Sequence, residues 1–143
     1  MGFASSIKAN SNKILLSVDK QCCQIACELF ALTVRLTPSP SFPGPYALGK
    51  LANQWYPEVG SYFSEELSSD ISATGADSLA RISALLTSRQ FYKNDGVMTL
   101  TNNLSYAYRA EVLGWPANEG WSGTIGPYRM VWHSIKTISA KYK

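Results

Sequence analysis

Apolar side chains recur every three or four positions along the N-terminal quarter of the chain. The stripe consists of Leu15, Val18, Cys22, Ile25, Leu29, Leu32 and Leu36. Residues at this spacing share one face of an α-helix, so we predict a long amphipathic helix from Ile14 to Leu36. We expect it to begin near Asn10 to Asn12, whose short polar side chains suit an N-cap. It must stop by Thr37, because Pro38 disfavours helical geometry at the residue before it.

A proline-rich connector follows the predicted helix. Its prolines are Pro38, Pro40, Pro43 and Pro45. Proline lacks a backbone N–H and cannot continue a helix, so residues 37–49 are expected to form a loop or a stiff arm. The next stretch, Leu51 to Val59, is rich in aromatic residues and ends at Gly60. This pattern predicts a strand.

A second helix is predicted after the polar, acidic surface segment Ser61 to Gly75. Asp77 can cap it, and it ends near Ser88. The apolar residues on its face are Leu79, Ile82 and Leu86. Beyond it, residues 94–96 carry a turn signal within the strand-like stretch 91–101, which predicts a β-hairpin.

The C-terminal third predicts a further short element, a loop and a closing helix. Tyr106 to Leu113 fits either another strand or a short helix, and Gly114 to Gly126 reads as a loop. Pro127 suits the first turn of the last helix. Residues of this helix that share a face are Val131, Ile135, Ile138 and Tyr142. The predicted fold is therefore α+β, with a long N-terminal helix and a small antiparallel sheet packed with a second helix and a C-terminal helix.

Length and composition favour one ordinary globular domain that spans residues 1–143. A domain commonly has about 100–150 residues. Thirteen basic and ten acidic residues give a net charge of +3. The basic residues are scattered except near the C-terminus, which is too sparse for a nucleic-acid footprint. No stretch approaches the roughly 18 apolar residues of a membrane span, and no signal peptide is recognisable, so we expect a soluble protein made in a cytoplasm, with no membrane contact.

Candidate catalytic and metal-binding residues are few. His133 is the one histidine of the chain, so a nucleophile, base and orienting residue would need an unusual set of partners. Cys23 and Cys27 could offer two thiolates from one helix, but no second pair completes a metal site. Glu65 and Glu66 read as a solvated acidic patch. Because phosphate-loop, nucleophile-elbow and dinucleotide motifs are also missing from the sequence, we expect no enzyme activity, no cofactor and no metal.

Aromatic residues make up 12% of the chain and anchor either the core or an interface. Those in the predicted strands fit the core. Trp115 and Trp121 lie in a glycine-rich stretch, where burial against a partner subunit is an alternative to burial in the core.

Several landmarks occur in a familiar order. They are Thr37-Pro38, Gly49-Lys50-Leu51, Asn53-Gln54-Trp55, Asn102-Asn103, Tyr106-Ala107, Glu111, Gly114 and Gly126-Pro127. In this order the chain resembles the tail-completion or neck proteins of tailed bacteriophages, the family that includes the lambdoid minor tail protein Z. The resemblance spans roughly residues 15–138. The connector is longer than is usual in that family, Lys50 stands where arginine is common, and the spacing from Glu111 to Gly114 is one residue longer.

The resemblance implies a structural virion protein at the head–tail junction, present in the host cytoplasm during assembly. Its expected partners are copies of itself in a ring, the head–tail connector or adaptor, and the tail terminator or tail tube. Genomic DNA would pass nearby without specific contact. The interface residues that we expect, in the two loops and directly after the first of them, are Pro43, Tyr46, Lys50, Trp115 and Trp121. Tyr106 and Glu111 match the family pattern and are expected to shape the fold.

Two other classes of protein remain open at this point. A small cytoplasmic binding or adaptor domain could use the long N-terminal helix as its partner surface. An enzyme with an unrecognised site is the second. Partner binding that depends on residues 14–36, without ring formation, would favour the adaptor.

Overall fold

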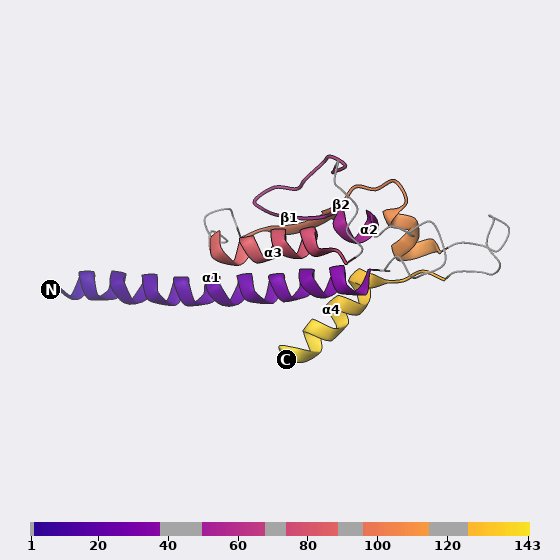
Figure 1. Cartoon of the computed structure of the whole chain (residues 1–143). Helices are drawn as coiled ribbons and strands as arrows, with labels where there is room; N and C mark the ends of the chain where they lie inside the picture. Colours follow the sequence, from indigo (N-terminus) through magenta and orange to yellow (C-terminus); the bar gives the residue numbers. More distant parts are fainter. Residues whose placement is uncertain (1, 38–49, 68–73, 89–95, 115–125) are drawn as a thin grey trace.

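The computed structural model describes residues 2–37, 50–67, 74–88, 96–114 and 126–143. Its elements are α1 (Phe3–Leu36), α2 (Lys50–Asn53), β1 (Trp55–Val59), α3 (Ala76–Ser88), β2 (Met98–Asn102), a π-helix (Arg109–Leu113) and α4 (Met130–Lys141). Helix α1 is a long rod with α3 and the sheet on one side and α4 on another (Figure 1). The predicted α+β fold, with its long first helix, small antiparallel sheet and closing helix, is confirmed.

Helix α1 ends where the sequence predicts but begins much earlier. It starts at Phe3, with Gly2 at the N-cap, so Asn10 to Asn12 lie inside the helix instead of capping it. Neither glycine nor proline occurs between Phe3 and Leu36, so no backbone breaker stops the helix at the asparagines. At the other end Thr37 is extended, and its hydroxyl donates to the Thr33 carbonyl at 2.8 Å.

The fully buried positions of α1 lie on a different face from the apolar stripe. They are Asp19, Cys23, Cys27, Phe30, Thr33 and Val34. In the stripe itself, Leu15, Val18 and Leu36 are exposed and the four positions between Val18 and Leu36 are half-buried. An amphipathic stripe ordinarily faces the core. In α1 the residues that face the core each lie about one position after a residue of the stripe, which places them roughly 100° around the helix from it.

The predicted strand from Leu51 is shorter than expected, because its first residues form α2. The side chain of Leu51 is fully buried there, and the strand β1 begins at Trp55. Strand β1 pairs antiparallel with β2, from Trp55 opposite Asn102 to Val59 opposite Met98. Of the predicted hairpin, residues 91–95 lie outside the described residues. Strand β2 therefore pairs with residues that lie 39 to 47 positions earlier in the chain.

Helices α3 and α4 are both present, but α4 begins at Met130 with Arg129 at the N-cap, so Pro127 precedes the helix and does not lie in its first turn as predicted. In α3, Ile82 is buried and Leu79 half-buried, whereas Leu86 is exposed. Asp77 lies in the first turn of α3 and not at its cap, since the helix begins at Ala76. Within the stretch Tyr106 to Leu113, Tyr106 lies in a turn and residues 107–113 are helical, which decides between the two predicted alternatives.

The predicted face of α4 is only partly correct. Val131 and Ile138 are half-buried, whereas Ile135 and Tyr142 are exposed. The fully buried residues, Met130 and Ser134, lie one position before Val131 and Ile135. The small side chain of Ser134 bonds back to the Met130 carbonyl at 2.7 Å and so needs no other partner in the packed face. As in α1, a row of larger apolar side chains is left toward solvent.

Candidate interface surfaces

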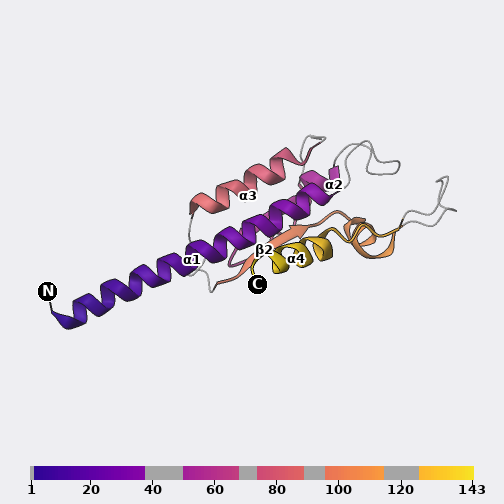
Figure 2. The same ribbon diagram turned by 90° about the horizontal axis from the view of Figure 1, so that it is seen from below.

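The N-terminal half of α1 projects beyond the rest of the molecule. Every residue from Gly2 to Val18 is exposed, whereas Asp19 is the first buried residue of the helix. We call residues 3–18 the arm and the remainder of the described chain the body. Figures 1 and 2 show from two directions that the arm continues the helix axis away from α3, α4 and the sheet. Because arm and body share one unbroken helix, the arm cannot fold back onto its own body.

The arm carries large apolar side chains that the described part of the chain leaves in water. They are Phe3, Ile7, Ile14, Leu15, Leu16 and Val18. The most exposed of them is Phe3, at 84%. Its only charged residues are Lys8 and Lys13, so the arm is basic as well as apolar. Single exposed apolar residues are common, but six within sixteen residues make the arm a candidate interaction surface.

A groove of about 1150 Å³ runs between α1, α3 and α4. Its apolar lining includes Ala31, Leu79, Ile82, Leu86 and Ile138. Its charged residues are Lys20, Glu28, Arg35 and Lys141. Figure 2 shows α3 and α4 on either side of α1. The groove therefore has an apolar floor with more positive than negative charge around it.

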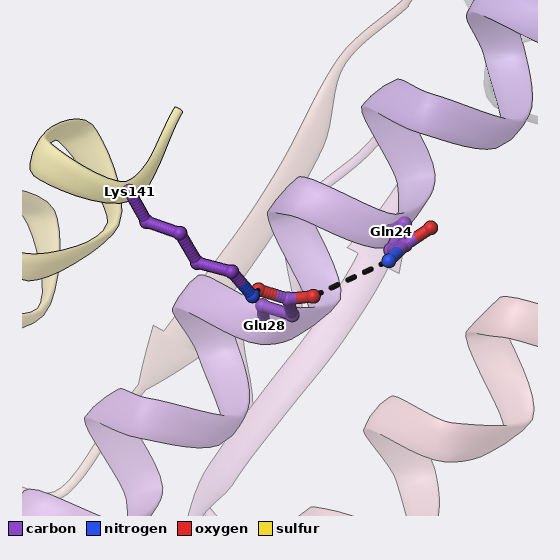
Figure 3. A network of polar contacts seen from close by, with 3 residues as sticks. All are labelled: Gln24, Glu28 and Lys141. Carbon is purple, nitrogen blue, oxygen red and sulfur yellow. Dashed lines mark hydrogen bonds and ion pairs between the residues drawn. The ribbon is translucent and has the colours of Figure 1, made fainter. Parts of the chain in front are cut away.

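One ion pair joins α4 to α1 beside this groove. Lys141 Nζ lies 2.5 Å from Glu28 Oε2, and Gln24 donates to the other carboxylate oxygen at 3.3 Å (Figure 3). The hydrogen bond from Lys141 lowers the pKa of Glu28, and the same bond raises the pKa of Lys141. Both partners are reached by solvent, so the pair orients α4 more than it stabilises the fold.

The cysteines at the groove are poor candidates for chemistry. Cys23 and Cys27 are buried, and their thiols point to the carbonyls of Leu85 and Ile82 at 3.8 Å and 3.7 Å. Burial, with the neighbouring Cys23, raises the pKa of Cys27 to about 12. A thiol must lose its proton to act as a nucleophile or metal ligand, so Cys27 is inert at neutral pH. Within the described residues, no three metal-ligating side chains gather at one place.

Glu111 has a structural role that agrees with its prediction. It lies in the π-helix, and its carboxylate accepts the backbone N–H groups of Val131 and Trp132 at 3.2 Å and 3.3 Å. These N–H groups belong to the first turn of α4, where they have no partner within the helix. Glu111 therefore caps α4 from another element, and its negative charge suits the helix N-terminus.

We expect Glu111→Ala to lower the free energy of unfolding by about 1–2 kcal/mol, as for the loss of an N-cap. Two N–H groups of α4 would lose their acceptor. Glu111→Gln keeps one acceptor oxygen for one of the two N–H groups, whereas its NH2 group cannot accept from the other and the charge is lost, so it should recover no more than about half of the loss. Urea unfolding followed by circular dichroism measures both variants. Equal stability of Glu111→Ala and the unchanged protein would contradict the capping role.

The interface residues predicted from sequence are not gathered by the described structure. Lys50 is the first residue of α2. Pro43, Tyr46, Trp115 and Trp121 lie outside the described residues, as do most of the two predicted loops. The exposed His133 stacks edge-on against Trp132 on the outer side of α4. The feature that sequence reasoning missed is the arm, although Phe3, Ile7 and Ile14 precede Val18 at helical spacing.

The chain has no match among models of known protein families, curated proteins or solved structures. Among the described helices, none is both long and apolar enough to span a lipid bilayer.

Proposed function

We propose that this protein is a non-catalytic structural subunit of a larger protein assembly, and that the assembly is the head–tail junction of a tailed bacteriophage. The observation that carries the first part is the arm, a stretch of sixteen helical residues with six large apolar side chains in water. We expect the apolar side chains of the arm to be buried against the surface of another protein. The second part is supported by the order of family-like landmarks along the sequence.

The energetics of the arm support an assembly role. A helix of this length is marginal in water by itself, because most helical stability in proteins comes from packing of an apolar face. Complete burial of one large apolar side chain contributes about 1.5–3 kcal/mol. Docking of even half of the arm would therefore offset much of the entropy cost of association.

The groove gives less support to an enzyme. Its sulfur atoms are buried thiols, and the pKa of Cys27 lies far above neutral pH. Its carboxylate, Glu28, is engaged by Lys141 and Gln24. Proton transfer needs an acid or base whose pKa lies near the working pH. The pKa of the Cys27 thiol is raised and the pKa of the Glu28 carboxyl is lowered, so both move away from neutral pH. Interface burial is the simpler use for such a surface.

In the proposed junction, identical subunits form a ring on the head–tail connector or the tail terminator. Head-to-tail contacts between copies close into a ring when the rotation between neighbours allows it. The proline-rich residues 37–49 and the stretch from Trp115 to Trp121 would supply further contacts. In this proposal the subunit uses no cofactor and makes no sequence-specific contact with the DNA that passes through the junction.

We expect the purified chain to form a closed ring, alone or on a connector or tail protein, and Trp121→Ala to weaken this assembly while its fold is kept. Native mass spectrometry and negative-stain microscopy measure the ring, and circular dichroism measures the fold. Tyr108→Ala is a matched control, since Tyr108 is an exposed aromatic residue outside the proposed contacts.

A variant Trp121→Ala that unfolds would place Trp121 in the core and remove it from the interface. A chain that forms no ring with any connector, terminator or tail-tube protein would remove the junction proposal. The loss of a ring must be judged at several protein concentrations, because ring closure depends on subunit concentration.

The arm also favours a second candidate, a binding domain that presents α1 to a partner. An amphipathic helix that docks in the groove of another protein uses apolar anchors at this spacing. Partner binding lost on substitution of Leu15 or Val18, with a single copy of the chain in the complex, would favour this adaptor over the ring.

A further inference from the structure

We propose that the arms of two copies pair side by side in antiparallel orientation, so that the free protein is a dimer in which each arm covers the other. This pairing concerns the chain before it meets any other protein. It is independent of the proposed head–tail junction, so either proposal can be wrong while the other is correct.

The apolar residues of the arm are placed symmetrically for such a pair. Phe3, Ile7, Ile14 and Val18 follow each other in steps of four, seven and four, which keeps them on one face of the helix. The outer two and the inner two have the same midpoint, between Asn10 and Ser11. When a second arm is laid antiparallel about this midpoint, Phe3 meets Val18 and Ile7 meets Ile14, each twice. The polar centre of one arm then meets the polar centre of the other.

The antiparallel orientation follows from where the body begins. Paired helices lie about 8–10 Å apart. In a parallel pair the two bodies, which begin at Asp19 and carry α3 and α4 packed against the rest of α1, would lie side by side at the same end of the pair. In the antiparallel pair the bodies lie at opposite ends of the two-helix rod. The N-terminus of each arm then reaches the point where the partner's body begins.

The groove between α1, α3 and α4 is a poorer receptor for the arm of a second copy. The arm carries Lys8 and Lys13 and no acidic residue. Around the groove, Lys20, Arg35 and Lys141 outnumber Glu28, which is bound to Lys141. Like charges would meet in that arrangement, whereas the arm-to-arm pair brings together apolar faces with lysines on the flanks.

The area of the arm pair predicts a weak dimer. Sixteen helical residues span about 24 Å, and a helix about 11 Å wide buries roughly 400 Å² when half covered, or about 800 Å² for both arms. Stable interfaces bury at least about 1,200 Å² in total. We therefore expect dimers that dissociate on dilution and that gain strength with added salt, because screening reduces repulsion between the lysines.

Cysteine cross-linking of the full chain tests the pairing and its direction. In a Cys22→Ser background, Ser11→Cys should form a disulfide-linked dimer under mild oxidation, because residue 11 lies beside the two-fold axis. Phe3→Cys mixed with Val18→Cys should give the mixed dimer, identified by peptide mass spectrometry. Phe3→Cys alone should not cross-link, since the two copies of residue 3 would lie about 22 Å apart and a disulfide needs Cα atoms within about 7 Å.

Leu16→Cys is the matched control for Ser11→Cys, because both residues are exposed but Leu16 lies on the opposite side of the same arm. The proposal is overturned if Leu16→Cys cross-links as readily as Ser11→Cys. It is also overturned if Phe3→Cys dimerises by itself, or if the unchanged chain sediments as a monomer at all concentrations. A ring formed on connector or tail proteins by a chain that is monomeric when free would remove the arm pair and leave the proposed function standing.

Discussion

Replacement of Trp55 by alanine is expected to lower the free energy of unfolding by about 3–5 kcal/mol, the range for a buried aromatic residue. Trp55 is 6% exposed and opens β1. Its indole N–H donates to the hydroxyl of Thr37 at 2.9 Å, which ties the end of α1 to the start of the sheet. The substitution removes both the packing and this bond. Urea unfolding followed by near-UV circular dichroism measures the loss.

Trp55→Phe separates the two contributions. It keeps most of the apolar volume and loses the hydrogen bond, so we expect a cost of about 1–2 kcal/mol. Thr37 keeps its own bond to the Thr33 carbonyl in either variant. If Trp55→Ala costs less than Trp55→Phe, or less than about 1 kcal/mol, the indole does not hold these elements together.

Gly75→Ala should destabilise the fold by about 2–4 kcal/mol, combining left-handed backbone strain with overpacking. Gly75 precedes α3 with a φ of +68°. A Cβ atom there would lie 2.7 Å from Cγ1 of Val34 and 3.1 Å from Cβ of Ala52. Val34 is 1% exposed and has no room to withdraw. The midpoint of urea unfolding measures the change.

Gly126→Ala provides the matched control, because a Cβ at Gly126 meets no atom within 4 Å. We expect a change within about 0.5 kcal/mol there, as for surface positions in general. The double variant Gly75→Ala with Val34→Ala relieves the contact with Cγ1, so its cost should be smaller than the sum of the two single costs. Strict additivity would show that the contact with Val34 contributes nothing to the loss at Gly75, which would leave backbone strain and the contact with Ala52.

The fold could be predicted from sequence wherever local signals decide the structure. The 3.6-residue spacing located α1, α3 and α4, and Pro38 ended α1 at the predicted residue. The start of α1 was missed because asparagines that suit a cap are also tolerated inside a helix that nothing else interrupts. Strand β1 was drawn too long, since an aromatic-rich run does not show that its first residues turn into α2.

The burial of each helix was less predictable than its position. In both α1 and α4 the apolar spacing was right, yet the fully buried residues lie one position away. Small or polar residues such as Thr33 and Ser134 occupy the packed face, because their hydroxyls bond to carbonyls of the same helix. A hydropathy pattern alone does not identify a buried face that contains such residues. Periodicity shows that a stripe exists, and only the tertiary neighbours show whether the core or a partner covers it.

Helix α1 thus carries two sets of sequence constraints on two sides of one backbone. Cys23, Cys27 and Val34 are constrained by the fold, because a change of volume there disturbs the core. The exposed residues of the arm, such as Leu15 and Val18, are constrained only by the surfaces that the protein binds. Substitutions on that side can accumulate while the monomer stays folded, so the binding preferences of this protein can diverge faster than its architecture.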